Sequence, residues 1–387
     1  MAANFKHIDL RLIDPPFGSK LNTWILELDY LRKKPLAGTT HPATFFQLKS
    51  IFHFLESIGS ARIEGNRTTL AEYMERKIEG SITREEKFIE IENNEKALDF
   101  IEKNIGHYKI DRLFLSELHK IVTQNLTPSP GGEGSKNPGE YRTTNVAIAR
   151  SSHIPPDVSA VASCMEELFE FINNQDPPQY DLLKVALVHH RFAWIHPFDN
   201  GNGRVVRLLT YAMLIKYGFK VDMGGRIINP TAVFCSDREK YYQFLSLADK
   251  GDDNNLLKWC EYVLSGLKDE INKIDRLLDY NYLAKKILLP ALGFALARKH
   301  ITEIEYKVLA ITVRRQEMQA GNLKPVLPNK LPAEISRIIR RLREKKMLQP
   351  KQKNTRKYVL RFESNYLLRG IIEMLDKENF LPIPVNK

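Results

Sequence analysis

The strongest constraint on the fold is a glycine-rich turn between two apolar segments with helical character. Residues 196–207 read His-Pro-Phe-Asp-Asn-Gly-Asn-Gly-Arg-Val-Val-Arg. An apolar stripe over 182–193 precedes this turn, and the apolar run 205–217 follows it. Gly201 and Gly203 allow the backbone to approach a ligand closely and to adopt positive φ. The sequence therefore predicts two consecutive helices joined by a loop that can bind a ligand.

The residues around this turn favour phosphate chemistry. We expect Asn202 to be the N-cap of the second helix, whose first amides would then point toward an anion. Arg204 and Arg207 lie three residues apart, so both side chains leave the same helix face. His196 directly precedes the turn, and a neutral imidazole, with an unperturbed pKa of about 6.5, suits a general base. A base, an anion cradle and two cations thus lie within twelve residues.

The pattern resembles the signature of the Fic family, His-x-Phe-x-Asp/Glu-Gly-Asn-Gly-Arg-x-x-Arg, whose members mostly transfer AMP from ATP to protein hydroxyls. Every fixed position except the acidic one matches. The resemblance implies that His196 takes the proton of the target hydroxyl. It implies that Arg204 binds the β-phosphate and the leaving pyrophosphate, and that Arg207 reaches the γ-phosphate. The implied nucleotide-binding residues of the signature are Asn200, Gly201, Asn202, Gly203, Arg204 and Arg207, with the Asn202 side chain as an added donor.

One position departs from the family pattern. Asn200 stands where the family usually has the acid that holds the metal, and the acidic Asp199 lies one place earlier. Magnesium prefers oxygen ligands and is commonly held by one or two carboxylates together with substrate phosphates. We expect Mg²⁺ to accompany ATP but to bind more weakly here, through the Asn200 carbonyl, with Asp199 as the alternative ligand.

A short segment upstream of the signature breaks the helical pattern. Residues 141–149 are rich in β-branched side chains between two proline-containing turns, which predicts a small β-hairpin. The run Gly139-Glu-Tyr-Arg-Thr-Thr-Asn-Val resembles the family's flap, which covers the nucleotide and aligns the target segment as an added strand. The resemblance implies the nucleotide-side flap residues Val146, Ala147, Ile148 and Ala149.

A later segment resembles the family's adenine-side helix. In the run that starts at Lys240, Tyr241 and Tyr242 match the paired tyrosines that face the base. The later polar position, usually Asn, is Asp249 here. The resemblance implies that these three residues contact the nucleotide, although a tyrosine pair on a helix taken alone is more often part of a core.

A second informative motif lies far upstream. Ser60-Ala-Arg-Ile-Glu-Gly-Asn resembles the family's inhibitory pattern, Ser/Thr-x-x-x-Glu-Gly/Asn. Helical spacing puts Ser60 and Glu64 on one face, and Gly65 ends the helix. The resemblance implies that Glu64 pairs with Arg207 and occupies the space that the γ-phosphate needs. Its position before the core indicates the self-inhibited group with an N-terminal inhibitory helix.

The positive charge is concentrated near the end of the chain. The formal net charge is +11, and residues 324–357 hold twelve Lys or Arg against only Glu334 and Glu344. Such local charge indicates a module with its own partner. Helices expected at 303–315 and 332–347, followed by a hairpin at 349–362, resemble a winged-helix module. Its partner would be duplex DNA, and the alternatives are a docking face for another protein or a merely solvated face. The exposed face would carry Arg337, Arg340, Arg341 and Arg343.

The whole chain is predicted to be mainly α, with a Fic-type helical core, a small β-hairpin flap and a C-terminal winged-helix domain. The expected domains are 1–105 (helical extension with the inhibitory helix), 106–280 (catalytic core) and 281–387. The 387 residues contain no apolar stretch of 18 residues and no signal-peptide core at the start. Cys164, Cys235 and Cys260 are widely spaced. We therefore expect a cytoplasmic protein with no membrane partner.

The leading hypothesis is a self-inhibited protein adenylyltransferase that modifies a Ser, Thr or Tyr hydroxyl of a target protein. The enzyme itself can be such a target, and a homodimer is compatible with this hypothesis. The alternative is a winged-helix DNA-binding regulator whose Fic core senses a nucleotide and has little catalytic activity. A phosphotransferase like the Doc toxins is disfavoured because those relatives carry Lys at the position of Gly203. AMP removal by Glu64 with a metal stays open.

Overall fold

The computed structural model describes a mostly helical chain, which confirms the mainly-α prediction. Two compact units are distinguished by their internal contacts. The first unit consists of Met1–Pro35, Glu56–Arg67 and Arg84–Ile271, and the second of Leu36–Leu55, Thr68–Thr83 and Asn272–Lys387. The three-domain division expected from the sequence stays a prediction. The described residues are 7–34, 39–80, 85–148, 151–222, 225–353 and 355–382.

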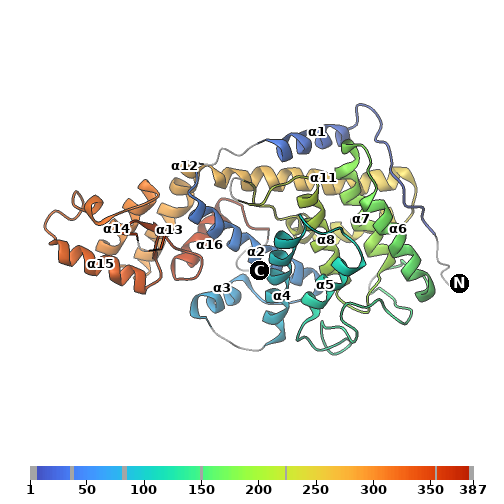
Figure 1. The fold of residues 1–387 in the computed structure, drawn as a ribbon, viewed down its shortest axis with the longest axis horizontal. Coiled ribbons are helices and arrows are strands. Elements are labelled where there is room, and N and C mark those ends of the chain that lie inside the picture. Colours follow the sequence, from blue (N-terminus) through green and yellow to red (C-terminus); the bar gives the residue numbers. More distant parts are fainter. Residues whose placement is uncertain are drawn as a thin grey trace. The chain divides into compact units, whose positions relative to one another are not determined.

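The first unit is built around two buried helices, α7 and α8, which pack against each other (Figure 1). Nearly all of α8 is buried, so its sequence shows no continuous polar face. None of the helices in the described ranges combines the length and hydrophobicity that a membrane span requires. The helices of this unit are α1 (Lys20–Lys33), α4 (Glu86–Asn104), α5 (Arg112–Thr123), η1 (Val158–Ala160), α6 (Val161–Asn173), η2 (Pro178–Tyr180), α7 (Asp181–Ile195), α8 (Asn202–Lys216), α9 (Thr231–Cys235), α10 (Arg238–Ala248) and most of α11 (Asp253–Asp275).

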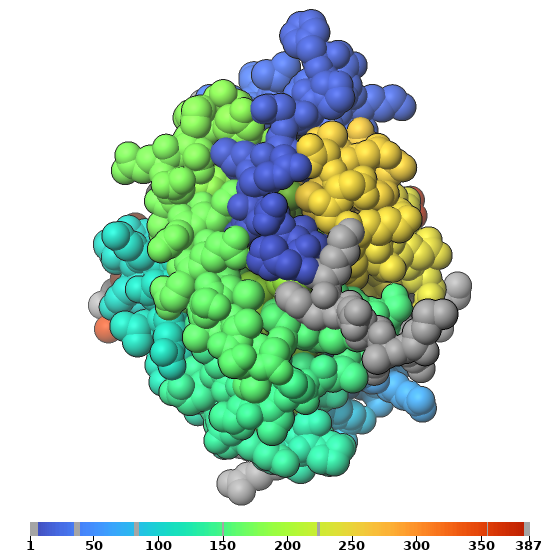
Figure 2. Space-filling view, turned by 90° about the vertical axis from the view of Figure 1, so that its right-hand side faces the viewer, coloured from blue at the N-terminus to red at the C-terminus, as the bar shows by residue number. Residues whose placement is uncertain are grey.

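The N-terminal segment covers the first unit. Figure 2 shows it between the green residues of the α6–α7 region and the yellow residues of α11. Ile8 and Ile13 are buried, and Arg191 of α7 donates a hydrogen bond to the carbonyl oxygen of Ile8 at 2.6 Å. The helix α1 that follows was not predicted. Its buried side chains, Leu21, Ile25, Leu28 and Leu31, have helical spacing.

The second unit contains the C-terminal module. The hairpin predicted at 349–362 is confirmed as a two-stranded antiparallel sheet in which Leu348 pairs with Leu360, and Met318 forms an additional bridge with Tyr358. The element order is therefore helix, bridge, helix, helix and hairpin. The elements are η3 (Arg276–Leu278), α12 (Tyr280–Tyr282), the π-helix η4 (Leu283–Leu288), α13 (Leu289–Ala297), α14 (Glu303–Arg315), η5 (Ala320–Leu323), α15 (Pro332–Glu344), β1 (Leu348–Pro350), β2 (Tyr358–Leu360) and α16 (Leu367–Lys377).

One long helix contributes to both units. Helix α2 (Pro42–Glu64) begins in the second unit and ends in the first with the predicted inhibitory residues. Within the second unit, Gln47 donates to the carbonyl oxygen of Leu360 and accepts from the amide of Phe362. The following α3 (Leu70–Glu79) begins with a capping box formed by Thr69 and Glu72.

The predicted β-hairpin at the flap is wrong. The described flap residues, 141–148, contain no strand. A ladder needs a neighbouring strand, whereas the polar groups here find other partners. The amide of Arg142 donates to the carbonyl oxygen of Pro197, and the side chain of Asn145 bonds both Asp157 and the amide of Val158. Tertiary contacts thus replace the strand that β-branched composition favoured.

We predict that Arg32→Met lowers the free energy of unfolding by about 1–3 kcal/mol, because partly buried carboxylates would lose their partner. Arg32 of α1 is buried, pairs with Asp29 and Asp181, and donates to the carbonyl oxygen of Tyr217 at 2.9 Å. Urea unfolding monitored by circular dichroism measures the change. The control Lys33→Met removes an exposed partner of Asp29 and should cost under about 0.5 kcal/mol. Equal losses in both variants would contradict this role for Arg32.

Candidate active site

The signature loop is set by two residues in left-handed conformations. His196 ends α7 with φ 51° and ψ 60°, and Gly201 caps α8 with φ 76°. The prediction that Asn202 is the N-cap is wrong, because α8 begins at Asn202 and Gly201 supplies the turn. The Asn202 side chain instead closes the loop, accepting from the amide of Phe198 and donating to its carbonyl oxygen, both at 2.9 Å. Its role as a phosphate donor stays a prediction.

His196 is neutral at physiological pH. Burial lowers its pKa to about 4, although a hydrogen bond to the backbone of Ala193 and the nearby Glu64 carboxylate act in the opposite direction. A neutral imidazole can accept a proton, which is the state that a general base requires. The two other histidines near the end of α7, His189 and His190, contact protein side chains. His189 contacts Thr210 and Tyr241, and the Nε2 atom of His190 lies 2.9 Å from Asp249.

The structure brings the predicted inhibitory residues onto α8. The Nη2 atom of Arg207 donates to Glu64 Oε1 at 2.6 Å, and Arg207 also bonds the side chain and backbone of Ser60. Burial disfavours the charged form of Glu64, yet the ion pair and hydrogen bond from Arg207 outweigh it, so the pKa of Glu64 is lowered. A Cβ atom at Gly203 would collide with the Glu64 carboxylate. Glycine at this position therefore gives room to the Glu64 side chain. Gly65, which follows Glu64, has φ 111°.

Arg204 is fully buried and surrounded by protein acceptors. Its Nη2 atom donates to the carbonyl oxygen of Glu133 at 2.5 Å and lies 3.3 Å from the Glu133 carboxylate. Its Nη1 atom donates to the carbonyl oxygen of Val122 at 3.2 Å. Its Nε atom faces Glu90 at 3.7 Å, and burial raises the pKa of Glu90 to about 7. Sequence reasoning missed both acids. The signal available for Glu90 was its position between Ile89 and Ile91 on a helix.

The side chains at the expected metal position are already engaged. Asp199 accepts from the Ser135 hydroxyl at 2.6 Å and from the amide of Lys136 at 3.0 Å. Asn200 accepts from the amide of Gly201 through the oxygen that would bind a metal. Among the described residues, no group of three or more His, Cys, Asp or Glu side chains could hold a metal ion. The magnesium prediction stays untested.

Two further residues, both missed from the sequence, shape the loop. Arg142 is buried and donates to the carbonyl oxygens of His196 at 3.0 Å, Thr144 at 3.0 Å and Pro156 at 2.5 Å. It therefore joins the flap to the signature. His119 stacks on Phe198 with ring centroids 3.9 Å apart. Its Nδ1 atom accepts from the amide of Gly139, so its Nε2 atom carries the proton and donates to the carbonyl oxygen of Asn200.

The predicted flap and adenine-side residues differ in how far they are exposed. Val146 and Ile148 are partly buried and Ala147 is exposed, whereas Ala149 lies outside the described residues. Tyr241 is buried, and Tyr242, with its ring centroid 5.3 Å away, is 39% exposed. The Tyr242 hydroxyl donates to the carbonyl oxygen of Ile63 at 3.5 Å. One predicted adenine contact therefore lies against the last turn of α2.

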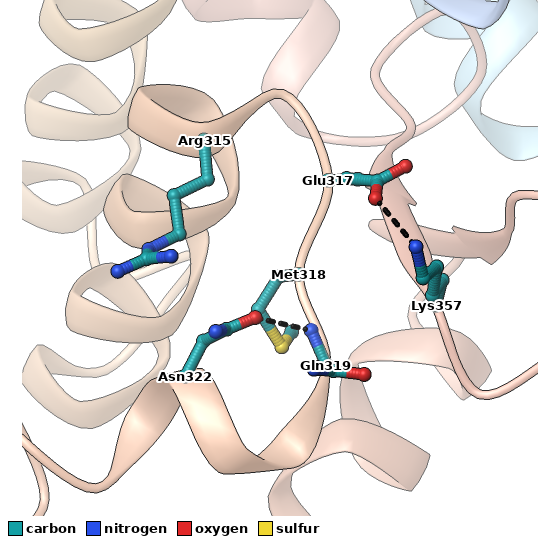
Figure 3. Close-up of a pocket in the computed structure, with 6 residues that line it drawn as sticks. All are labelled: Arg315, Glu317, Met318, Gln319, Asn322 and Lys357. Atoms are coloured by element: carbon teal, nitrogen blue, oxygen red, sulfur yellow. Dashed lines mark hydrogen bonds and ion pairs between the residues drawn. The ribbon is translucent and has the colours of Figure 1, made fainter.

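In the second unit, α15 presents a basic face. The predicted residues Arg337, Arg340, Arg341 and Arg343 are all exposed, while Ile335, Ile339 and Leu342 are buried. The guanidinium carbon of Arg343 lies 5.8 Å from the ring centroid of Tyr358 in β2. A polar cavity of about 330 Å³ opens beside the hairpin, with Arg315 and Lys357 on its lining (Figure 3).

The comparisons with known proteins agree with this geometry. Residues 109–214, which include the whole signature, match the model of the Fic/DOC family. The chain is 30% identical over 206 residues to proteins named protein adenylyltransferase Fic from Drosophila mojavensis and Drosophila melanogaster, over 52% of this chain and 37% of each relative. It thus spans well under half the length of these curated relatives.

Solved structures share the fold. A Fic family protein from Desulfovibrio desulfuricans superimposes with a TM-score of 0.54 at 20% identity, covering 90% of this chain and 98% of that one. Fic-1 from Caenorhabditis elegans gives a TM-score of 0.52 at 21% identity, covering 66% of this chain and 72% of that one. The signature loop lies inside the matched segment, so the chain carries a Fic domain at residues 109–214.

Proposed function

We propose that this protein is a protein adenylyltransferase that transfers AMP from ATP to a hydroxyl of a target protein, and that Glu64 inhibits it by binding Arg207. The observation that supports this most is the pairing of Glu64, at the end of α2, with Arg207 of α8, close to the neutral His196. An ion pair that only stabilised the fold would require neither Gly203, which makes room for the Glu64 carboxylate, nor the nearby His196.

The proposed reaction uses the residues of the signature. The hydroxyl oxygen of the target attacks the α-phosphorus of ATP, and its proton passes to the imidazole of His196. The bond between the α-phosphorus and the bridging oxygen breaks, and pyrophosphate leaves with that electron pair. Arg204 and Arg207 would stabilise the negative charge on the leaving phosphates, since such transfer depends mainly on positioning and electrostatic stabilisation. The free amides at the start of α8 would add to this stabilisation.

Inhibition follows from competition for one guanidinium. Arg207 already directs its Nη2 atom to Glu64 and Ser60. A γ-phosphate would need the same donors and would meet the Glu64 carboxylate. ATP could then bind only with its α-phosphate misaligned to the incoming hydroxyl, so the chemical step would be slow although the nucleotide binds.

We predict that Glu64→Gly raises AMP transfer by about tenfold or more. In this variant, Arg207 can form a charge-assisted hydrogen bond to the γ-phosphate in place of the one to Glu64. The variant should also lose about 1–3 kcal/mol of stability without nucleotide, since Arg207 loses its partner. Labelling of the protein and of a cell lysate with α-³²P-ATP measures the gain. Arg207→Ala alone should not activate, because it also removes the γ-phosphate contact. Equal labelling by wild type and Glu64→Gly would contradict self-inhibition.

A second prediction concerns the base. In the Glu64→Gly background, His196→Ala should lower labelling by about 10²–10⁴-fold, the usual effect of removing a general base. ATP affinity should stay nearly unchanged, because the imidazole acts on the target hydroxyl and the anion cradle is intact. Isothermal titration calorimetry and labelling measure the two quantities. The control His107→Ala, at an exposed turn, should change neither. Retention of more than about a tenth of the activity would remove His196 from this role.

A second candidate function is DNA binding by the C-terminal module. It is favoured by the exposed arginines of α15 next to a hairpin whose two lysines, Lys351 and Lys357, share the single acid Glu317 and so leave one positive charge in excess. Helix, bridge, helices and hairpin in this order resemble a winged-helix module, in which such a helix enters the major groove. A DNA-bound regulator and a DNA-localised adenylyltransferase would share this surface.

We therefore predict that the full chain binds duplex DNA with an affinity that falls steeply with salt, as phosphate contacts release counterions. The triple variant Arg337→Gln/Arg340→Gln/Arg341→Gln should lower the slope of log K against log salt by up to about 3 and leave labelling of the Glu64→Gly protein unchanged. Fluorescence anisotropy with a labelled duplex at several salt concentrations tests this. Salt-insensitive or absent binding would leave the face as a protein-docking or solvated surface.

A further inference from the structure

Residues 127–136, here called the covering loop, contact the signature at three positions, Asp199, Asn200 and Arg204. Ser135 and Lys136 donate to Asp199. The side-chain amide of Asn200 donates to the carbonyl oxygens of Gly132 and Gly134, both at 3.2 Å. Glu133 accepts from Arg204. The loop therefore occupies the side of the site where the resemblance implies a metal and the β-phosphate.

The covering loop is held in this shape by its own residues. The amide of Gly134 donates to the carbonyl oxygen of Thr127 at 2.8 Å, and the Thr127 hydroxyl donates to Glu86 of α4. A Cβ atom at Gly132 would lie 2.7 Å from the carbonyl oxygen of Thr127, and one at Gly134 would collide with the backbone of Leu126. The glycines thus allow a tight loop that presents Glu133 between them.

The contacts made to Arg204 compete with those that a phosphate would make. The Nη2 atom of Arg204 donates to both the backbone oxygen and a carboxylate oxygen of Glu133. The Nε atom of Arg204 and the facing Oε1 atom of Glu90, 3.7 Å away, are buried without a hydrogen-bond partner in the described part of the chain. Arg204 therefore contacts two acids, but its Nε–H group lacks a hydrogen-bond acceptor. An oxyanion that bonded this group as well could displace the acids.

We propose that the covering loop is a second inhibitory element, in which Glu133 withholds Arg204 from the β-phosphate just as Glu64 withholds Arg207 from the γ-phosphate. The inference rests on the proposed nucleotide-binding function of the signature. The two acids come from separate segments and engage separate guanidinium groups, so releasing one leaves the other in place. Glu64→Gly alone would then give a partly released enzyme.

ADP and AMP separate the two inhibitory contacts. ADP carries the β-phosphate that Arg204 would bind and lacks the γ-phosphate, whereas AMP lacks both. Isothermal titration calorimetry of the full chain would compare wild type, Glu133→Gln and Glu133→Lys with each nucleotide. The control Glu117→Gln changes an exposed acid on α5 that pairs only with Lys120 among the described residues. Thermal unfolding would confirm that each variant folds.

Glu133→Gln should raise ADP affinity about two- to fivefold, the size expected for an ion pair whose acid is 43% exposed. Glu133→Lys should raise it further, and neither variant should alter AMP affinity. Adding Glu133→Gln to Glu64→Gly should increase labelling beyond Glu64→Gly alone. Unchanged or weaker ADP binding by both Glu133 variants would overturn the proposal, because Glu133 would then be inert or would orient Arg204 for phosphate. Since binding needs no catalysis, a loss of the proposed transferase activity would be distinguished from a failure of this inference.

Discussion

The burial of two guanidinium groups determines how this site is built. Arg204 and Arg207 are both buried in the first two turns of α8. A buried charge is costly unless it is paired and hydrogen-bonded, so the fold must surround each arginine with acceptors. Glu64 and Ser60 serve Arg207, and Glu133, Glu90 and Val122 serve Arg204. Because these acceptors occupy the guanidinium donors, any anion that binds the two arginines must replace contacts that stabilise the fold.

The local parts of this arrangement were predictable from the sequence. Apolar periodicity and two glycines defined α7, the turn and α8, and the spacing of Ser60, Glu64 and Gly65 defined the end of α2. The same reasoning failed where partners are distant in sequence. The flap composition favoured strands, but Arg142 and Asn145 provide the hydrogen bonds that a ladder would supply.

Residues that act through distant contacts left no local pattern. Glu133, Glu90, His119 and Arg142 contact the signature from segments 54 or more positions earlier in the chain. The cap of α8 was misplaced for a similar reason, because Asn202 bonds the backbone of Phe198, and that contact depends on the closed loop. The local sequence pattern thus predicted the helices and the signature, whereas the acids that contact the two arginines could be identified only from the tertiary structure.

A comparison of ATP with ADP shows directly whether Glu64 competes with the γ-phosphate for Arg207, as we propose. The measurement is the ratio of ATP to ADP affinity in wild type and in Glu64→Gly, by isothermal titration calorimetry on the full chain. Glu64→Gly is expected to raise ATP affinity more than ADP affinity, because only ATP carries the phosphate that would replace the carboxylate. An unchanged ratio would contradict it.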